Sequence, residues 1–411
     1  MSNTAPIAIV GGGPCGLTFA RLLERAGIEY VVFERDDSPE PKPDHQGGTL
    51  DLHTTTGLAA LDAAGLREEF EKFARYDAAV FTVQNSQGGH FFRADAGATG
   101  EEQRPEIDRF QLREILLDSL PKERVRWGKT LKAIVREKAG NESSAKGWVL
   151  KFADGTEESG FRMVVGADGA SSAVRPLITP AKPLYSGKTY IEGRLTPNNP
   201  SYAAALEMVG PGNSVATGPG SVIAIQQTAD RSYRVYAGIK EADTSRTRPG
   251  GILDFTTDVE KSKKELLDNY YAGWAPHLRE YIQNTEAPYR VWPLYTLDAA
   301  TFAPDAEWTR APGVTLLGDA AHVALPNGEG VNLAMLDALN LFQALTAELG
   351  KTGEDENAAI ERAIMTYEKD MRKSAKEHAE DGIQMNDIMY QFDGAEKLIA
   401  FFKSFENEGQ S

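Results

Sequence analysis

Three glycines near the start of the chain have the spacing of a phosphate-binding turn. They follow an apolar run at 7–10 and precede a helix-like run that begins at Leu17. In such a strand, turn and helix, Gly11 permits the tight turn, Gly13 lets a pyrophosphate approach the backbone, and Gly16 lets the helix pack against the strand. The unpaired N–H groups at the helix start attract the phosphates. The pattern therefore predicts a dinucleotide-binding site.

Three acidic residues that follow apolar runs extend this prediction. Glu34 stands 18 residues past Gly16 (34 minus 16), where an acid binds the ribose hydroxyls of a dinucleotide. Asp168 and Asp319 lie in small-residue turns after two later apolar runs. We expect the ends of these strands to meet at one ligand.

The chain carries no second glycine pattern of this kind. The Gly-Pro-Gly turns at 210–212 and 218–220 lack the third glycine and stand between alternating runs that are typical of antiparallel strands. We therefore expect one resident dinucleotide, and a nicotinamide cofactor would have no strand-and-helix unit of its own.

The other chemically capable side chains give a weaker signal. Six histidines and one cysteine show no metal-ligand spacing, so we expect no metal site. His322 stands just inside a predicted helix start, which favours a packing role over that of a general base, and His53 and His45 are still weaker candidates. Cys15 lies in the glycine turn without a partner base, which disfavours a reactive thiol. We assign no catalytic residue.

Composition restricts the partners and the location of the protein. The net charge of -16 disfavours nucleic acid and anionic membranes, because an acidic surface is repelled by both. No apolar run approaches the roughly 20 residues of a membrane span, and residues 1–6 lack the basic start and apolar core of a signal peptide. A single cysteine fits a reducing compartment. We expect a cytoplasmic monomer or weak dimer that acts on a small molecule.

The order of the elements predicts an α/β fold with two sheets. The strands that carry the glycine turn and the acidic residues are expected to share one parallel sheet. Alternating runs at 221–228 and 233–240 indicate an antiparallel sheet in a second unit. Residues 106–120 are predicted to form an amphipathic helix, and the chain is helical again from about 356 to 405.

Taken in order, the glycine turn, the Asp168-Gly169 turn and the Gly318-Asp319 turn resemble the marks of class A flavin monooxygenases, the para-hydroxybenzoate hydroxylase type. The resemblance covers nearly the whole chain. Within that family the chain looks most similar to the subgroup that hydroxylates and inactivates tetracyclines, through the segments 47–53, 108–113, 318–322 and 330–332.

Together with the element order, this resemblance predicts three parts and their cofactors. The FAD-binding domain is Rossmann-like, with a parallel sheet, and is discontinuous (1–72, 105–186 and 286–340). An antiparallel-sheet substrate domain (73–104 and 187–285) and a C-terminal helical segment (341–411) complete the chain. FAD is the expected resident cofactor, with NADPH or NADH as a transient reductant and O2 as a co-substrate.

The resemblance also implies roles for single residues. Glu34 would bind the adenosine ribose, and Asp51 would contact FAD near the flavin. Asp319 would bind its ribityl or pyrophosphate part, while the turn 326–332 would lie against the isoalloxazine with a helix aimed at its pyrimidine edge. The implied FAD contacts are Gly11, Gly13, Gly16, Glu34, Arg35, Asp51, Arg113, Asp168, Asp319, Pro326, Gly330, Val331 and Asn332.

Some positions depart from the tetracycline-degrading subgroup. Asp44, with Lys42 as the nearest cation, stands where the subgroup has an arginine that meets NADPH, which leaves the choice between NADPH and NADH open. Ser214 falls near a substrate-contacting arginine of the subgroup, so tetracycline itself is a less favoured substrate. Glu329 stands where the family commonly has glutamine, and its carboxylate either opposes flavin reduction or faces solvent.

These features predict an FAD-dependent monooxygenase that uses NAD(P)H and O2 to hydroxylate an electron-rich aromatic, enolic or indolic compound through a flavin C4a-hydroperoxide. Strand position and polarity select Glu192, Arg194, Gln226 and Tyr236 as candidate substrate contacts. Two alternatives stay open. One is a Baeyer-Villiger or epoxidising flavin oxygenase of the same fold, and the other is a dinucleotide-binding redox sensor without turnover.

Overall fold

A five-stranded parallel sheet carries the glycine turn. The computed structural model describes residues 5–40, 47–89, 91–94, 104–136, 147–351 and 355–408. The strand order is β17-β11-β1-β2-β7, and every neighbouring pair is parallel. The strands are β1 (Ile7–Val10), β2 (Tyr30–Phe33), β7 (Val125–Arg126), β11 (Met163–Gly166) and β17 (Val314–Leu316). All except β7 are buried along their length, as in parallel sheets that are covered on both faces.

Helices and a small sheet cover this parallel sheet. The helices are α1 (Pro14–Arg25), α2 (Gly57–Ala64), α3 (Arg67–Glu71), α4 (Arg109–Asp118), α8 (Asp319–His322) and α9 (Gly330–Leu349). A three-stranded antiparallel sheet consists of β8 (Leu131–Arg136), β9 (Trp148–Phe152) and β10 (Glu157–Glu158). Phe33 of β2 packs on Phe152 of β9, with ring centroids 4.9 Å apart.

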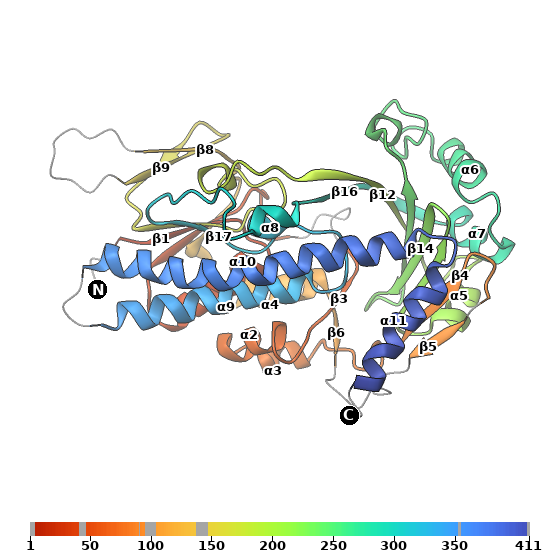
Figure 1. Cartoon of the computed structure of the whole chain (residues 1–411), viewed down its shortest axis with the longest axis horizontal. Coiled ribbons are helices and arrows are strands. Elements are labelled where there is room, and N and C mark those ends of the chain that lie inside the picture. Colours follow the sequence, from red (N-terminus) through yellow and green to blue (C-terminus); the bar gives the residue numbers. More distant parts are fainter. Residues whose placement is uncertain are drawn as a thin grey trace.

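A seven-stranded sheet forms the second unit, at the right of Figure 1. Its order is β16-β12-β15-β14-β13-β4-β5, and all neighbours are antiparallel except the parallel pair of β13 and β4. Its strands are β4 (Phe81–Asn85), β5 (Phe92–Ala94), β12 (Leu184–Leu195), β13 (Asn213–Gly218), β14 (Ser221–Gln227), β15 (Tyr233–Lys240) and β16 (Glu286–Thr296). Helices α5 (Tyr202–Val209), α6 (Val259–Tyr270) and α7 (Pro276–Gln283) belong to this unit, and apolar residues of all three join its core. The predicted α/β class with a parallel and a second sheet is confirmed, although the second sheet is mixed.

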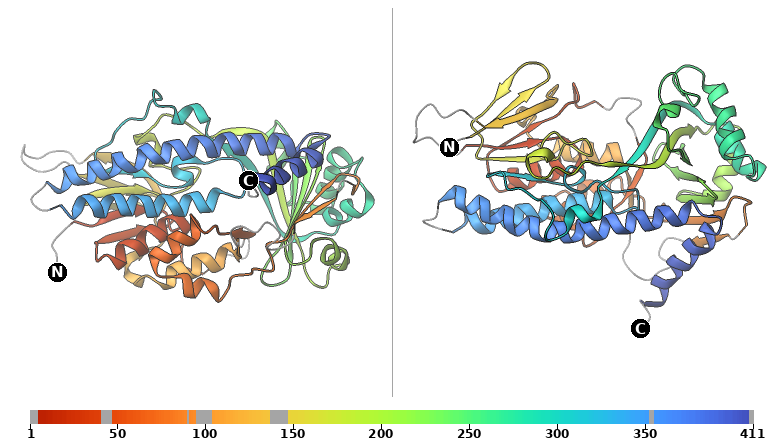
Figure 2. Two further views of the ribbon diagram at one scale, coloured as in Figure 1. Left: turned by 60° about the horizontal axis from the view of Figure 1, so that its bottom comes forward. Right: turned by 45° about the horizontal axis from the view of Figure 1, so that its top comes forward.

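A long helix joins the two units. Helix α10 (Glu356–Met389) packs along α9 and continues to the seven-stranded sheet, as Figures 1 and 2 show. Helix α11 (Gly394–Glu408) then packs on β4 and β13. Met389, Tyr390 and Leu398 share an apolar cluster with Val83 and Val215 of the sheet. The C-terminal helices therefore hold the two sheets in one arrangement.

The structure corrects several predicted boundaries. Strand β16 pairs with β12, so 286–296 lies in the seven-stranded sheet and not in the FAD-binding domain. Helix α9 begins at 330, so the boundary at 341 falls inside it. A helix was predicted at 106–120, but residues 106–108 form a strand, β6 (Glu106–Asp108), which pairs with β3 (Thr49–Asp51). The helix α4 begins only after Asp108, because Asp108 caps it in a capping box with Gln111.

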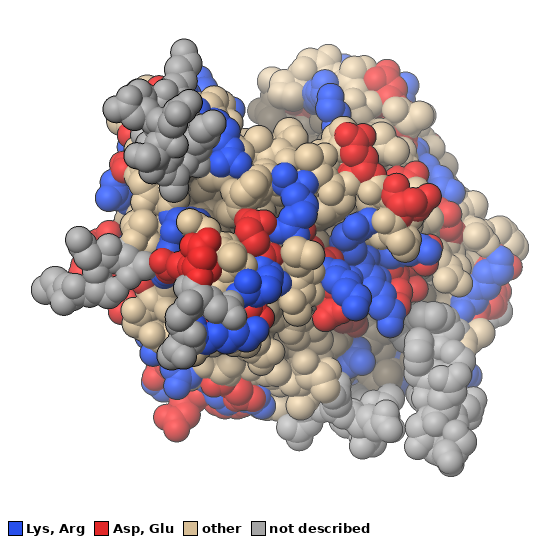
Figure 3. All heavy atoms as spheres, turned by 60° about the vertical axis from the view of Figure 1, so that its left-hand side comes forward, with Lys and Arg blue, Asp and Glu red and all other residues tan. Residues whose placement is uncertain are grey.

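Charged side chains of both signs alternate over the face shown in Figure 3. The net charge of -16 is therefore not gathered there into one acidic patch. In the part of the chain that the structure describes, no helix is long and apolar enough to cross a membrane.

The turn at Gly11 gives a test of the fold. Gly11 has φ +113°, and a Cβ at this position would lie 2.2 Å from the carbonyl oxygen of Ala167. Gly27 has φ +66° with no atom within 4 Å of such a Cβ, so Gly27→Ala introduces backbone strain alone, about 1 kcal/mol. We expect Gly11→Ala to lower the thermal unfolding midpoint clearly more than Gly27→Ala. Equal shifts in a melting experiment would show that the contact with Ala167 is not a packing constraint.

Candidate active site

A cleft of about 2740 Å³ runs from the glycine turn to the seven-stranded sheet. It lies at the carboxyl ends of the parallel strands, where ligands of open α/β sheets bind. Eleven predicted FAD contacts line it, namely Gly11, Gly13, Glu34, Arg35, Asp51, Arg113, Asp168, Asp319, Pro326, Gly330 and Val331. Gly16 and Asn332 do not line it. Residues far apart in the sequence are thus assembled around one space.

The glycine turn leaves room for a ligand at Gly13. A Cβ there would meet no protein atom within 4 Å, and no side chain caps the N-terminus of α1. Glu34 is 6% exposed and accepts hydrogen bonds from the N–H groups of Gly12 (2.5 Å) and Asp36 (2.9 Å). Gly16 serves packing instead, because a Cβ on it would lie 2.2 Å from the carbonyl oxygen of Gly11.

Arg113 ties the glycine turn to the segment after β2. Its guanidinium donates to the carbonyl oxygens of Gly12 (3.2 Å) and Pro39 (3.3 Å) and pairs with Asp36. Arg35 lines the same end of the cleft and is exposed. Two cations therefore stand where the negative charge of a pyrophosphate would enter.

The Asp168 and Asp319 turns are clamped together by Arg175, which is 3% exposed. Its guanidinium donates to the carbonyl oxygens of Ala320 and Asp319, both at 2.8 Å, and to that of Ala170, also at 2.8 Å. Arg175 belongs to the quoted Asp-Gly segment but was not predicted as a site residue, because its partners lie 144 and 145 residues away.

Asp168 has an unused oxygen at the cleft. Its Oδ2 accepts from the Ala173 N–H at 2.7 Å, whereas the buried Oδ1 has no hydrogen-bond partner among the described residues. Burial raises the pKa of Asp168. A buried polar atom without a partner is costly, so this oxygen marks a place for a ligand donor.

Asn332 lies near the start of α9 and does not line the cleft. It is fully buried; its Oδ1 accepts from the His53 N–H, and its Nδ2 donates to the Asp51 carbonyl oxygen, both at 2.9 Å. The contact of Asn332 with FAD stays a prediction, and its side chain is occupied in joining β3 to α9.

His53 connects two carboxylates at this loop. Its Nε2 lies 2.8 Å from Asp51 Oδ2, and its Nδ1 lies 3.3 Å from Glu329 Oε2. Burial opposes the charged imidazolium, but the hydrogen bonds and charges of Asp51 and Glu329 outweigh it and raise the pKa of His53 to about 9. The Glu329 side chain is 45% exposed, so it is partly solvated while it also pairs with His53. No sequence pattern indicated this triad, because its three members become neighbours only through the fold.

Three of the four candidate substrate contacts, Glu192, Gln226 and Tyr236, line the cleft on the seven-stranded sheet. Arg194 does not, because it lies two residues beyond Glu192 on the same face of β12, where β16 places Glu286 beside it. Ser214 lines the cleft as well.

Two residues of β16 complete this wall. Trp292 donates its indole N–H to Glu192 Oε2 at 2.8 Å, and the Arg290 guanidinium lies 3.5 Å from the centre of the Trp292 ring. Neither residue was predicted from the sequence, because 286–296 was expected in the FAD-binding domain and instead pairs with β12.

The other candidate residues make buried contacts within the protein. His322 lies off the cleft and meets Asp337 at 2.5 Å, with both side chains 2% exposed. Cys15 donates its thiol to the Ala334 carbonyl oxygen, and burial raises its pKa well above the usual range. Among the described residues, no group of three or more His, Cys, Asp or Glu could hold a metal ion. Lys42, Asp44 and His45 lie outside the described residues.

The residues present fit FAD. A pyrophosphate and its sugars fit the open space at Gly13, the two cations Arg35 and Arg113, and the Asp168 oxygen that has no partner. Glu34 stands where an acid binds a ribose. Gly330, the first residue of the 20-residue helix α9, lines the cleft farther along, where its N–H groups favour a ligand that becomes negative.

The His53 triad makes stability depend on pH. The folded pKa of about 9 exceeds the unfolded value of about 6.5, so the stabilisation is fully present below about pH 6.5 and is lost as pH rises through about 9. We expect the wild type to lose more stability than His53→Gln between pH 6.5 and 9.5, measured by urea unfolding. Equal losses in the two proteins would contradict the pairing.

Comparison with known proteins identifies the family. The family model described as FAD binding domain matches residues 4–380. The monooxygenase penA of Penicillium thymicola is 30% identical over 430 residues, which cover 95% of this chain and 97% of that protein.

Solved structures share the fold. The structure of Klebsiella pneumoniae HpxO complexed with FAD and uric acid has a TM-score of 0.71 at 20% identity and covers 98% of this chain and 93% of its own. Tetracycline destructase Tet(55) has a TM-score of 0.69 at 15% identity, with 99% and 97% covered. These likenesses show the fold and single out no subgroup. The family match and the relative of nearly equal length show that the chain belongs to the class A FAD-binding monooxygenases and is a flavin-dependent monooxygenase.

Proposed function

We propose that this enzyme hydroxylates a small, planar, electron-rich aromatic, enolic or indolic compound at the expense of NAD(P)H and O2. The observation that carries the proposal is the single cleft, which runs from the FAD-binding turns to the polar and aromatic wall of the seven-stranded sheet. FAD supplies the reduction of O2 and the transfer of oxygen when it is bound. The chain supplies binding, orientation and exclusion of water.

The wall combines aromatic rings with the polar side chains of Glu192, Ser214 and Gln226. The Tyr190 and Tyr236 rings lie 6.1 Å apart, and Gly48 approaches so closely that a Cβ on it would lie 2.5 Å from the Tyr236 hydroxyl. Phe81 and Met385 add apolar surface to the same cleft. This arrangement suits a planar ring that is held by stacking and by one or two hydrogen bonds.

A tetracycline substrate is not favoured. The segments at 47–53 and 330–332 resemble the tetracycline-degrading subgroup, but Ser214 lines the cleft near the position of that subgroup's substrate-contacting arginine. We propose a smaller aromatic substrate. Oxygen insertion or epoxidation by the same cofactor would use the same cleft, and product analysis separates these reactions from hydroxylation.

A substrate screen tests the proposed function. Purified holoenzyme is mixed with NADPH or NADH and a panel of phenols, indoles, quinolines, uric acid and tetracycline. We expect a yellow protein, NAD(P)H oxidation that rises at least about tenfold with a ring compound, and a product heavier by one oxygen atom. A protein that binds no FAD, or oxidation that no compound stimulates, would falsify the proposal.

Glu329 provides a second test. Reduced flavin carries more negative charge than oxidised flavin, so a neighbouring carboxylate opposes reduction even when His53 shares its charge. We expect Glu329→Gln to raise the flavin midpoint potential and to speed reduction by NAD(P)H up to about tenfold, which corresponds to ~1.4 kcal/mol.

The matched control is Glu348→Gln, which removes the same charge near the C-terminal end of α9, where Glu348 pairs with Lys351 and Arg362. It should leave the potential unchanged. An unchanged potential in Glu329→Gln as well would mean that Glu329 acts only toward solvent and His53.

A further inference from the structure

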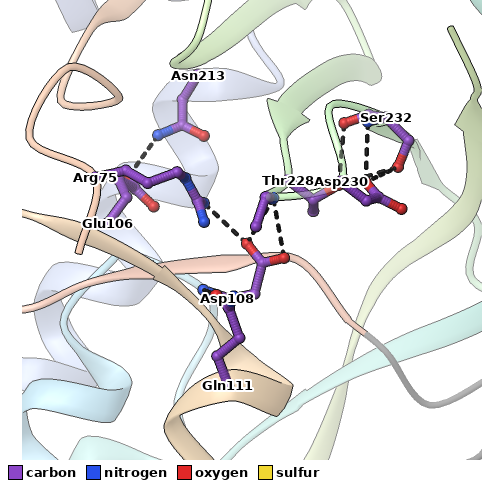
Figure 4. Close-up of polar contacts among 9 residues, drawn as sticks. Arg75, Glu106, Asp108, Gln111, Asn213, Thr228, Asp230 and Ser232 are labelled. Atoms are coloured by element: carbon purple, nitrogen blue, oxygen red, sulfur yellow. Dashed lines mark hydrogen bonds and ion pairs between the residues drawn. The ribbon is translucent and has the colours of Figure 1, made fainter. Parts of the chain in front are cut away.

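Glu106 stands where the two units meet across the cleft. It lies on the short strand β6, opposite Asp51 of β3, and it lines the cleft together with Asn213 of β13. Figure 4 shows Asn213 reaching toward it from the seven-stranded sheet. Glu106 therefore sits between the cofactor end and the substrate wall, although no sequence motif singled it out.

One oxygen of Glu106 is used and the other is not. Oε1 accepts a hydrogen bond from the Asn213 side-chain amide at 2.6 Å, whereas Oε2 is buried and has no hydrogen-bond partner among the described residues. The whole residue is 5% exposed. A buried polar atom without a partner is costly, and because Glu106 lines the cleft, a molecule bound there can supply the missing partner.

The nearest cation does not neutralise this carboxyl. Arg75 exchanges two backbone hydrogen bonds with Glu106, but its side chain turns to Asp108, at 2.8 Å, as Figure 4 shows. Asp108 is held further by the Ala229 N–H at 3.0 Å. The guanidinium thus forms its ion pair with the neighbouring acid, although its Nη1 and Nη2 make no hydrogen bond among the described residues.

The surroundings favour the neutral carboxylic acid. Burial and then the charge of Asp51 raise the pKa of Glu106 to about 8, with a smaller contribution from Asp108. The Asn213 hydrogen bond and the Arg75 charge act in the opposite direction and do not cancel the shift. At neutral pH Glu106 therefore carries a proton that it can donate in a hydrogen bond.

We propose that Glu106 contacts the substrate and donates a hydrogen bond from its second carboxyl oxygen to an acceptor atom, so that the enzyme prefers aromatic compounds that carry a carbonyl oxygen beside the ring. This inference rests on the proposed function, because it concerns the substrate of the same cleft. It adds a substrate class, that of neutral aromatic amides, lactams and ketones. It also assigns Glu106 a role in specificity.

Binding of two small probes tests the inference. The probes are 4-methoxybenzamide, which has a carbonyl acceptor, and 4-methylanisole, which has none; neither ionises between pH 6.5 and 9.5. Calorimetry on the holoenzyme without NAD(P)H gives both dissociation constants. We expect the wild type to prefer the amide by about three- to tenfold at pH 6.5, the worth of one hydrogen bond, and to lose that preference at pH 9.5, where Glu106 is ionised.

Two variants separate specificity from packing. Glu106→Gln keeps an oxygen for Asn213 and offers an N–H donor at every pH, so its preference for the amide should be the same at pH 6.5 and 9.5. Asn213→Ala breaks the bond between the units but keeps the carboxyl. It should still prefer the amide at pH 6.5, with the loss moved to higher pH, because the Asn213 bond lowers the pKa of Glu106.

The inference is overturned if neither probe binds, if the wild-type preference is the same at both pH values, or if Glu106→Gln keeps the wild-type pH dependence. A purely structural role for Glu106 would change the binding of both probes equally. The binding experiment measures no turnover, so the two proposals can fail separately. If the holoenzyme shows this pH-dependent preference but hydroxylates nothing, only the proposed function is contradicted. A hydroxylase without it contradicts only the role of Glu106.

Discussion

The candidate site depends on the parallel register of three strands. Val10 of β1 lies beside Gly166 of β11, and Gly166 lies beside Leu316 of β17. All three strands therefore end at one edge of the sheet and deliver their turns to one place. The approach is closest at Gly11, where only a residue without a side chain fits against β11. Arg175 then fixes the spacing of the other two turns through backbone carbonyl groups.

Directional polar contacts, and not only apolar packing, set the geometry across the cleft. Glu106 meets Asn213, and Asp108 meets the backbone of Ala229 between β14 and β15. Buried polar groups are costly unless they are bonded, so these contacts penalise any slip of one unit against the other. The apolar cluster at the end of α10 strengthens the same arrangement from the other side.

Charged side chains of both signs line the cleft, among them Arg35, Arg113 and Glu106, while the oxidative chemistry itself comes from the cofactor. His53 lies between Asp51 and Glu329, so the carboxylate of β3 and that of the loop before α9 share one cation. Asn332 holds the backbone on both sides of that cation. The charge near the loop is thus determined by three segments that come together only in the folded chain.

The local parts of this protein follow from short stretches of its sequence. A strand, a glycine turn and the start of a helix are encoded within residues 7–16, and an acid follows 18 residues past Gly16, so the positions of Gly11, Gly13 and Glu34 in the cleft could be predicted. The order of the turns indicated the family. Which side chains line the cleft depends on the tertiary structure. The Asn332 side chain bonds to the backbone of β3, and Arg194 lies outside the cleft. Strand β16 places Trp292 and Arg290 in the cleft wall, and Glu106 lies on a strand where the start of a helix was predicted. Each of these outcomes depends on a partner that is distant in sequence, and neither periodicity nor spacing carries information about such a partner.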